Sequence, residues 1–328
     1  MTRGEDDAAG RAPAGEEAIE RGARILREGG LVAFPTETVY GLGADATSAA
    51  AVAKIYAAKG RPSFNPLIAH VADIDAARRE AELPPAALRL AEAFWPGPLT
   101  LVAPRAAGGS VCELARAGLG SVALRAPSAP VARALILAAG RPIAAPSANR
   151  SGHVSPVTAA HVLGDIGPMV DLVIDGGRAD KGVESTIVAF LGARPRPRLL
   201  RPGALAREAL EQVLGAPLEG EGGAAAVVAP GMTASHYAPT ARLRLEAEKL
   251  RAGEAGLDFG GRLAERGGEG PILDLSPSAD LAEAAANLFL YLRELDAGGA
   301  RAVAVAPIPA HGLGEAINDR LRRAAAPK

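Results

Sequence analysis

Residues 34–70 read FPTETVYGLGADATSAAAVAKIYAAKGRPSFNPLIAH, and this segment holds most of the local patterns from which the fold can be argued. Just before it, the apolar run at residues 31–34 predicts a short buried strand. Pro35 ends that strand because it lacks a backbone donor. Residues 47–58 carry apolar side chains at helical spacing and predict a helix, with Gly60 suited to a left-handed cap. The segment therefore predicts a strand, a polar turn and a helix that ends beside two cations.

Three motifs in this segment belong together. They are FPTETVYGLG at residues 34–43, KGRP at residues 59–62 and NPLIAH at residues 65–70. In the first motif, Gly41 and Gly43 let the backbone turn freely or lie close to a ligand. Together the motifs resemble the YrdC-type threonylcarbamoyl-AMP synthases, and further matches are spread over most of the chain. The resemblance implies the twisted open sheet of the YrdC fold and an enzyme that makes threonylcarbamoyl-AMP.

Length and composition limit the class of protein. A chain of 328 residues exceeds the usual size of one domain, so two domains are expected. The net charge of -1 provides no overall field for nucleic acid. The lone Cys112 permits neither an internal disulfide nor a multi-cysteine metal site, which favours a reducing cytosol and a cytoplasmic location. No run of 18 apolar residues occurs, so we expect no membrane span, and the acidic N-terminus does not fit a signal peptide.

Composition divides the chain into four parts. Residues 1–15 are polar and rich in Ala and Gly, which predicts a disordered tail. Alternating strand and helix patterns over residues 16–215 predict an α/β or α+β domain. The resemblance implies that this domain is the YrdC-like catalytic domain, a sheet with flanking helices. Residues 216–240 are dominated by Gly, Ala and Pro, which predicts a linker. Strand and helix patterns return over residues 241–328 and predict a small Rossmann-like domain.

Periodicity and end signals locate the individual elements. We expect strands at residues 31–34, 99–103, 121–125, 142–145, 171–175, 185–190, 198–200, 241–246, 271–275 and 301–306. We expect helices at residues 16–28, 47–58, 84–95, 129–139, 158–163, 205–214, from Ser278 as the N-cap to the stop at Gly298, and at 314–325.

Two cations at the end of the helix in the opening segment are candidate phosphate ligands. Lys59 and Arg61 can neutralise a triphosphate, the first as a point charge and the second as a fork. Alternatively, they are solvated side chains at a helix C-terminus, where cations are favoured. In the family that the chain resembles, this Lys-x-Arg pair works with a downstream Ser-x-Asn, and Ser147-Ala-Asn149 follows a predicted strand. The resemblance therefore implies catalytic roles for Lys59, Arg61, Ser147 and Asn149.

The resemblance also implies the substrate contacts. The residues that match ATP contacts are Arg61, Asn65, Ser121, Ser147, Ser155, Arg201 and Tyr237. The residues that match the threonine pocket are Thr38, His70, Arg125, Ala145 and Ser185. Arg125 suits the carboxylate of the amino acid, whereas His70 has the alternative of a satisfied core histidine at a strand end. No G-x-x-x-x-G-K-[ST] sequence occurs, so ATP would bind outside a Walker loop.

The implied substrates are L-threonine, bicarbonate and ATP, with Mg²⁺ accompanying ATP. The implied product serves the formation of N6-threonylcarbamoyladenosine next to the tRNA anticodon, so the implied partners are tRNA and the downstream threonylcarbamoyl-transferase machinery. The five histidines are scattered, and we expect no protein-held metal. One alternative is a double-stranded RNA- or tRNA-binding module without catalysis, which the near-zero net charge disfavours. Another is the carbamoyl transferase of hydrogenase maturation, whose zinc-finger regions one cysteine cannot supply.

The predicted linker contains the sequence GMTASHYAP at residues 231–239, which looks like the family's linker motif. Stiff proline-containing dipeptides bracket its one polar-aromatic group, His236 and Tyr237. We expect the linker to run back over the cleft of the first domain, so that Tyr237 and His236 cover ATP as a lid and exclude water. Alternatively, these two residues dock the linker onto the second domain.

Overall fold

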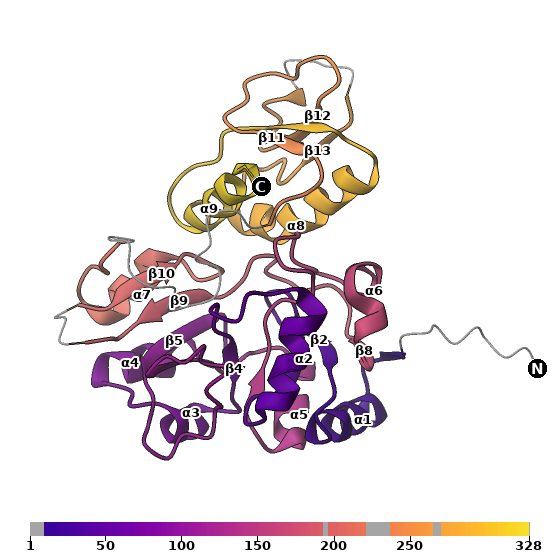
Figure 1. The fold of residues 1–328 in the computed structure, drawn as a ribbon. Coiled ribbons are helices and arrows are strands. Elements are labelled where there is room, and N and C mark those ends of the chain that lie inside the picture. The colour runs from indigo at the N-terminus through magenta and orange to yellow at the C-terminus, as the bar shows by residue number, and fades with distance from the viewer. Residues whose placement is uncertain (1–9, 193–195, 221–236, 265–269, 328) are drawn as a thin grey trace, which may run out of the picture.

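Two units of different size make up the chain (Figure 1). The computed structural model describes residues 10–192, 196–220, 237–264 and 270–327. The larger unit contains a ten-stranded sheet and the smaller one a four-stranded sheet. Within these ranges, no helix has the length and apolar character that a bilayer crossing requires.

The sheet of the larger unit is open and mixed, with the strand order β1-β8-β2-β3-β7-β4-β6-β5-β9-β10. Its strands are β1 (Arg11–Pro13), β2 (Val32–Pro35), β3 (Tyr40–Asp45), β4 (Ile68–His70), β5 (Leu99–Pro104), β6 (Ser121–Arg125), β7 (Ile143–Ala144), β8 (Leu172–Asp175), β9 (Thr186–Ala189) and β10 (Arg198–Arg201). The sheet contains both parallel pairs, such as β4–β6, and antiparallel pairs, such as β5–β6. A large twisted sheet with flanking helices confirms the predicted fold class.

Helices cover both faces of this sheet. They are α1 (Glu16–Arg27), α2 (Ala49–Lys59), α3 (Ile74–Glu80), α4 (Pro85–Phe94), α5 (Pro130–Ala139), α6 (Ala159–Ile166), the 3₁₀ turn η1 (Gly167–Met169) and α7 (Arg207–Leu214). Alternate side chains of β2 enter different cores: Ala33 joins the core beneath α2 and α4, and Phe34 joins the core beneath α1 and α5. Because successive strand residues point to opposite faces, the sheet is buried on both sides.

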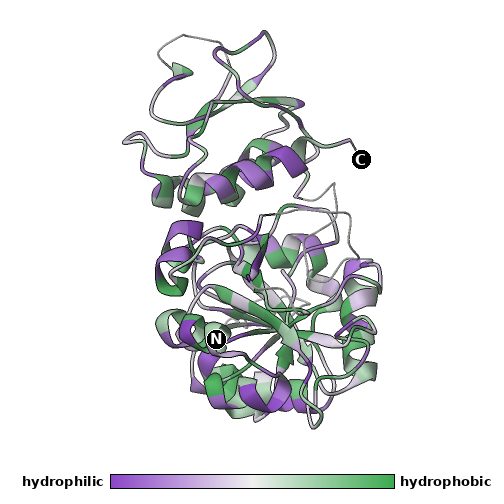
Figure 2. Cartoon of the chain, turned by 90° about the vertical axis from the view of Figure 1, so that its left-hand side faces the viewer, coloured by the Kyte–Doolittle hydropathy of each residue, from purple (hydrophilic) through white to green (hydrophobic). Residues whose placement is uncertain are grey.

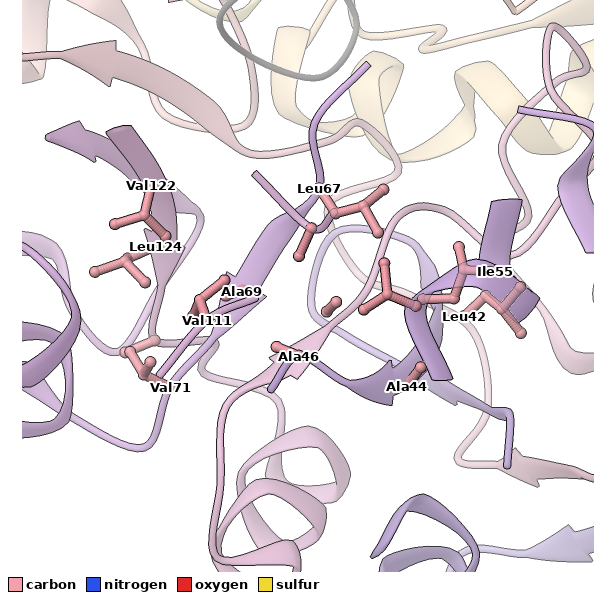
Figure 3. Close-up of a cluster of buried hydrophobic side chains, with 14 of the residues drawn as sticks. Leu42, Ala44, Ala46, Ile55, Leu67, Ala69, Val71, Val111, Val122 and Leu124 are labelled. Carbon is pink, nitrogen blue, oxygen red and sulfur yellow. The ribbon is translucent and has the colours of Figure 1, made fainter. Parts of the chain in front are cut away.

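The larger core is built from small and branched aliphatic side chains. Figure 3 shows part of it, with Leu42 and Ala44 of β3 near Ile55 of α2. Ala69 of β4 and Leu124 of β6 lie further along the sheet. Alanine at strand positions lets helices approach the sheet closely, so few aromatics are needed to fill the interior. Aromatic residues are 3% of the sequence.

The smaller unit has a parallel sheet in the order β11-β14-β12-β13. Its elements are β11 (Arg242–Arg244), β12 (Ala255–Asp258), β13 (Ile272–Asp274), α8 (Leu281–Ala297), β14 (Ala302–Val305) and α9 (Leu313–Ala325). Figures 1 and 2 both place α8 and α9 between this sheet and the larger unit. The two helices therefore present one face to their own sheet and the other to the neighbouring unit.

Polar contacts join the two units. The Arg178 guanidinium donates to the Ala286 carbonyl of α8 at 2.6 Å. Arg207, at the start of α7, forms an ion pair of 2.5 Å with Glu315 of α9. These contacts fix how the second unit sits on the loops that follow the strands of the first.

The predicted disordered tail extends too far. Its residues 1–9 lie outside the described ranges, but Arg11–Pro13 form β1 and pair in parallel with β8. Arg11 also forms an ion pair of 2.6 Å with Asp175. This short polar segment is ordered because it pairs with β8, a strand far from it in the sequence. Local composition does not reveal such a pairing.

The glycines of the opening segment do not form a turn. Gly41 and Gly43 lie within β3, which is antiparallel to β2. A Cβ on Gly43 would lie 2.7 Å from the Phe34 ring, so the glycine makes room for an aromatic side chain in the neighbouring strand.

Other differences concern element ends and missed elements. The N-cap of α8 is Asp280, which accepts from the Glu283 amide at 2.8 Å, and not Ser278. The elements that the sequence patterns did not indicate, besides β1 and β3, are β4, α3, η1 and β12. They are short, at three to seven residues, and carry too few apolar positions for a clear period.

Candidate active site

A cleft opens where several strands of the large sheet end, as expected for open sheets that bind ligands at strand ends. Its lining comes from the β2–β3 loop, the start of β3, the segment after α2, β4, the end of β6, the segment after β7, the residues just before β9, the end of β10 and Tyr237. The lining residues are Thr36, Thr38, Val39, Gly41, Arg61, Ile68, His70, Arg125, Ala145, Pro146, Ser147, Glu184, Ser185, Arg201 and Tyr237.

The cleft brings together every residue predicted for the threonine pocket. From the predicted catalytic and nucleotide set it gathers Arg61, Ser147, Arg201 and Tyr237. Four further predicted residues lie in the walls behind the lining, and these are Lys59, Asn65, Asn149 and Ser155. Ser121 is different, because it begins β6 whereas Arg125 ends it, which separates them by about 13 Å along the strand.

One end of the cleft is built around Arg125. Its Nη2 lies 2.7 Å from Oε1 of Glu37, and its Nη1 donates to the Thr38 hydroxyl at 3.0 Å. Both partners of this ion pair are buried. Burial raises the pKa of Glu37, but Arg125 outweighs it and holds that pKa below the ordinary value. Glu37 was not among the predicted site residues, although it stands between two threonines of the first motif.

His70 lies at the end of β4 in the same part of the cleft. Burial and the nearby Arg125 lower its pKa from 6.5 to about 3, so the imidazole is neutral at physiological pH. Its Nδ1 is buried and has no hydrogen-bond partner among the described residues. A buried nitrogen without such a partner beside a cleft is a candidate for ligand contact.

The buried imidazole leads to a pH-dependence prediction. Because the pKa of His70 is below the unfolded value, the unfolded chain binds the proton more tightly, and the folded state loses stability as pH falls from about 6.5 toward 3. His70 alone should cost about 2 kcal/mol of unfolding free energy between pH 7 and pH 5. Urea unfolding of H70N at both pH values should show a loss smaller by that amount than in the wild-type protein.

The exposed His311 offers a matched control for this measurement. H311N should keep the wild-type difference between pH 7 and pH 5. An H70N protein with the full wild-type difference would contradict the assignment of a buried neutral imidazole.

Two further arginines, Arg61 and Arg201, line the cleft. Arg61 donates from Nε to the Asn65 carbonyl at 3.2 Å and from Nη2 to the Pro66 carbonyl at 2.9 Å. Burial lowers the pKa of Arg61 to about 10, which still leaves it charged near neutral pH. Arg201 donates from Nε and Nη2 to the Ser185 carbonyl at 3.1 and 2.8 Å. In the described part of the chain, no carboxylate lies within ion-pair distance of either guanidinium, so both charges suit an anion.

Lys59 is buried behind the lining. Its Nζ donates to the Ser147 carbonyl at 2.6 Å and also to the Asn149 carbonyl. Lys59 and Arg61 are only 3% and 8% exposed, so the alternative of two solvated helix-end cations is wrong. Burial, followed by the proximity of Arg61, places the pKa of Lys59 well below its ordinary value. The lysine holds the Ser147–Asn149 main chain in place at the cleft.

Two buried asparagines, Asn65 and Asn149, also belong to the wall of the cleft. The Asn149 amide donates to the carbonyls of Arg150 and His153 at 2.8 and 2.9 Å. The side-chain oxygens of Asn149 and Asn65 are buried without a hydrogen-bond partner in the described ranges. Unpartnered buried acceptors near a cleft are candidates for ligand or water contact.

Tyr237 connects the cleft to the smaller unit. Its ring stacks on Phe289 of α8 with centroids 5.5 Å apart, and Arg320 and Arg323 of α9 lie 5.2 and 5.4 Å from the ring centroid. Its φ of 63° is in the left-handed region, which a tyrosine adopts at a cost. Tyr237 thus both lines the cleft and docks on the second unit. His236 and most of the predicted linker, residues 221–236, lie outside the described ranges.

The side chains present suit a nucleoside triphosphate that arrives with a bound Mg²⁺ ion. The described residues contain no group of three or more His, Cys, Asp or Glu side chains that could hold a metal ion. The two cleft arginines, and the main chain held by Lys59, face the same space. Such a site would bind Mg²⁺ through the phosphates of the nucleotide.

Comparisons with known proteins agree over most of the chain. A family model described as "Telomere recombination" matches residues 24–203, and one described as "Threonylcarbamoyl-AMP synthase, C-terminal domain" matches residues 205–326. The chain is similar to the threonylcarbamoyl-AMP synthases of Bacillus subtilis (41% identity, covering 94% of this chain and 92% of the relative) and Pyrococcus abyssi (42%, 93% and 93%). The crystal structure of P. abyssi Sua5 complexed with L-threonine superposes with a TM-score of 0.86 at 38% identity, covering 96% of each chain.

Proposed function

The chain belongs to the threonylcarbamoyl-AMP synthase family of AMP-transferring enzymes, and from this premise we propose that it condenses L-threonine, bicarbonate and ATP into threonylcarbamoyl-AMP and pyrophosphate. The product would serve the formation of N6-threonylcarbamoyladenosine next to the anticodon of tRNA in the cytoplasm. The observation that carries the proposal is one cleft lined by Arg125, which pairs with Glu37, and by two arginines without carboxylate partners in the described ranges, Arg61 and Arg201.

Arg125 would bind the carboxylate of threonine. Its guanidinium is already oriented by Glu37 and Thr38, so little rotational freedom is lost on binding. Ser185 and the neutral His70 offer polar atoms for the threonine hydroxyl, and Ala145 offers an apolar contact for its methyl group. The P. abyssi structure complexed with L-threonine supports threonine as the ligand.

The first chemical step needs proximity more than it needs a protein nucleophile. The neutral amine of threonine attacks the carbon of bicarbonate and water leaves, which gives a carbamate. Binding both reactants in one closed site supplies the entropic part of this barrier. No covalent enzyme intermediate is required.

The second step transfers AMP. A carbamate oxygen attacks the α-phosphorus of ATP, and the bond to the β-phosphate oxygen breaks, so that pyrophosphate leaves with the electron pair. Negative charge grows on the transferring and leaving phosphates, where Arg61 and Arg201 would stabilise it. Ser147 would contribute a hydroxyl, and Lys59 would hold the main chain of Ser147 in position. Mg²⁺ bound to ATP would neutralise further phosphate charge.

Pyrophosphate release tests the proposal directly. The purified chain is mixed with ATP, Mg²⁺ and each of the twenty amino acids, with and without bicarbonate. Release should require both bicarbonate and threonine. Release that does not depend on threonine, or none at all, would contradict the proposal and leave an RNA-binding role without catalysis as the stronger alternative.

The pocket chemistry predicts the order of amino-acid substrates. Serine keeps the hydroxyl but lacks the methyl group, and one missing methyl is worth about 10- to 200-fold in kcat/KM. Valine lacks the hydroxyl and would leave the polar atoms around His70 and Ser185 unpaired, so its kcat/KM should be lower by about 10⁴-fold. Steady-state pyrophosphate release gives all three values. Equal kcat/KM for serine and threonine would refute the pocket.

A further inference from the structure

The smaller unit inserts one arginine into the wall of the cleft. Arg320 of α9 is fully buried, and its Nε donates to Oε2 of Glu184 at 2.9 Å. Its Nη1 donates to the Pro202 carbonyl at 2.9 Å and to Asp319 at 2.6 Å. The contact with Glu184 joins residues 136 positions apart and crosses from one unit to the other.

Glu184 is a buried carboxylate in the lining of the cleft. Its Oε1 accepts from the Ser155 hydroxyl at 2.5 Å, and it is itself a lining residue. The next residue, Ser185, accepts from Arg201 through both its carbonyl and its hydroxyl. Glu184 therefore directly precedes the residue that Arg201 contacts. Its negative charge would repel incoming phosphates.

The charges around Glu184 come from several elements. Burial raises its pKa, but Arg320 and then Arg201 outweigh burial and lower it to about 2, so the group is a carboxylate at working pH. Arg320 makes the direct ion pair, whereas Arg201 acts from a greater distance. Without Arg320, Arg201 would be the main cation that compensates this buried carboxylate among the described residues.

We propose that Arg320 is a positioning residue for nucleotide binding. By neutralising Glu184 from the second unit, it leaves the charge of Arg201 to the phosphates of ATP, so the nucleotide site is complete only when α9 is docked. This inference rests on the proposed function, since it takes ATP as the ligand. It gives the smaller unit a part in substrate binding that does not need contact with the substrate.

The test compares ATP binding and threonine binding in the full-length chain. Titration calorimetry gives the Kd of each ligand without turnover, and pyrophosphate release gives kcat and KM. R320M should weaken ATP binding at least about 10-fold while changing threonine binding by less than about 3-fold. R320K keeps the charge but loses the bonds of the fork, and its ATP affinity should stay within about 5-fold of wild type.

Two further variants separate charge from structure. Arg322 lies on the same helix, two positions from Arg320, but it is exposed. R322M should therefore bind ATP within about 3-fold of wild type. The double variant E184Q/R320M removes both charges and should recover most of the ATP affinity that R320M loses.

Several outcomes would overturn the proposal. They are a folded R320M that binds ATP normally, an equal loss for ATP and threonine, an R322M as weak as R320M, or a double variant without recovery. If R320M does not fold, R320K decides, because a loss of more than about 10-fold there would contradict a role through charge. Failure of the proposed function has a different signature, because the wild-type chain would then release no threonine-dependent pyrophosphate whatever its affinity for ATP.

Discussion

Replacing Arg61 by alanine should lower the kcat of threonine-dependent pyrophosphate release by at least about 100-fold. The guanidinium lines the cleft, is buried, and makes its described hydrogen bonds to the carbonyls of Asn65 and Pro66. Those acceptors orient the side chain without cancelling its charge. A buried, preoriented cation stabilises charge that develops on a phosphate far more than a solvated one does. Because that charge grows in the transition state, the loss should fall mainly on kcat.

The kinetic experiment needs a control that removes an equal charge elsewhere. Arg78 of α3 has a side chain that is 53% exposed and pairs weakly with Asp75 at 3.8 Å. R78A should keep kcat and KM within about 2-fold of wild type. Near-normal turnover of R61A, with R78A behaving as expected, would mean that Arg61 does not serve the phosphates.

Replacing Arg125 by methionine should raise the KM for threonine by at least about 100-fold. The substitution removes the cation proposed to bind the amino acid's carboxylate and also leaves Glu37 buried without its partner. Breaking one side of a buried ion pair typically costs about 3–5 kcal/mol. R125M should therefore lose unfolding free energy as well as threonine affinity, measured by urea unfolding and by steady-state kinetics.

A double variant separates these two losses. E37Q/R125M no longer buries an unpaired carboxylate, so it should regain much of the unfolding free energy. It should not regain threonine affinity, because the carboxylate of the substrate still lacks its arginine. Recovery of both properties together would show that Arg125 supports the fold and does not bind threonine.

Local patterns in the sequence located most of the elements. The period of two at residues 121–125 corresponds to β6, which has the predicted bounds. The apolar face predicted after Ser278 corresponds to α8, where Leu288, Phe289 and Leu292 are buried as expected. Gly60 ends α2 with a φ of 57°, as its position suggested. These signals depend on residues a few positions apart, and such interactions survive in any arrangement of the elements.

The resemblance to a family extended the sequence argument to the cleft. It selected Thr38, His70, Arg125 and Ser185, all of which line the cleft. Their roles remain predictions, and residue types alone could not have grouped them. It also selected Lys59 together with Arg61, without indicating that one supports the main chain and the other faces the cleft.

The sequence therefore specified the class of fold, the family and most of the secondary structure. Three-dimensional packing was needed to show that Arg11 belongs to the sheet, that Lys59 points inward, and that Arg320 meets Glu184. The physical reason is the range of the interactions. Apolar periodicity and caps act between near neighbours, whereas a buried ion pair across 136 positions is stable only after two hydrophobic cores have formed and docked.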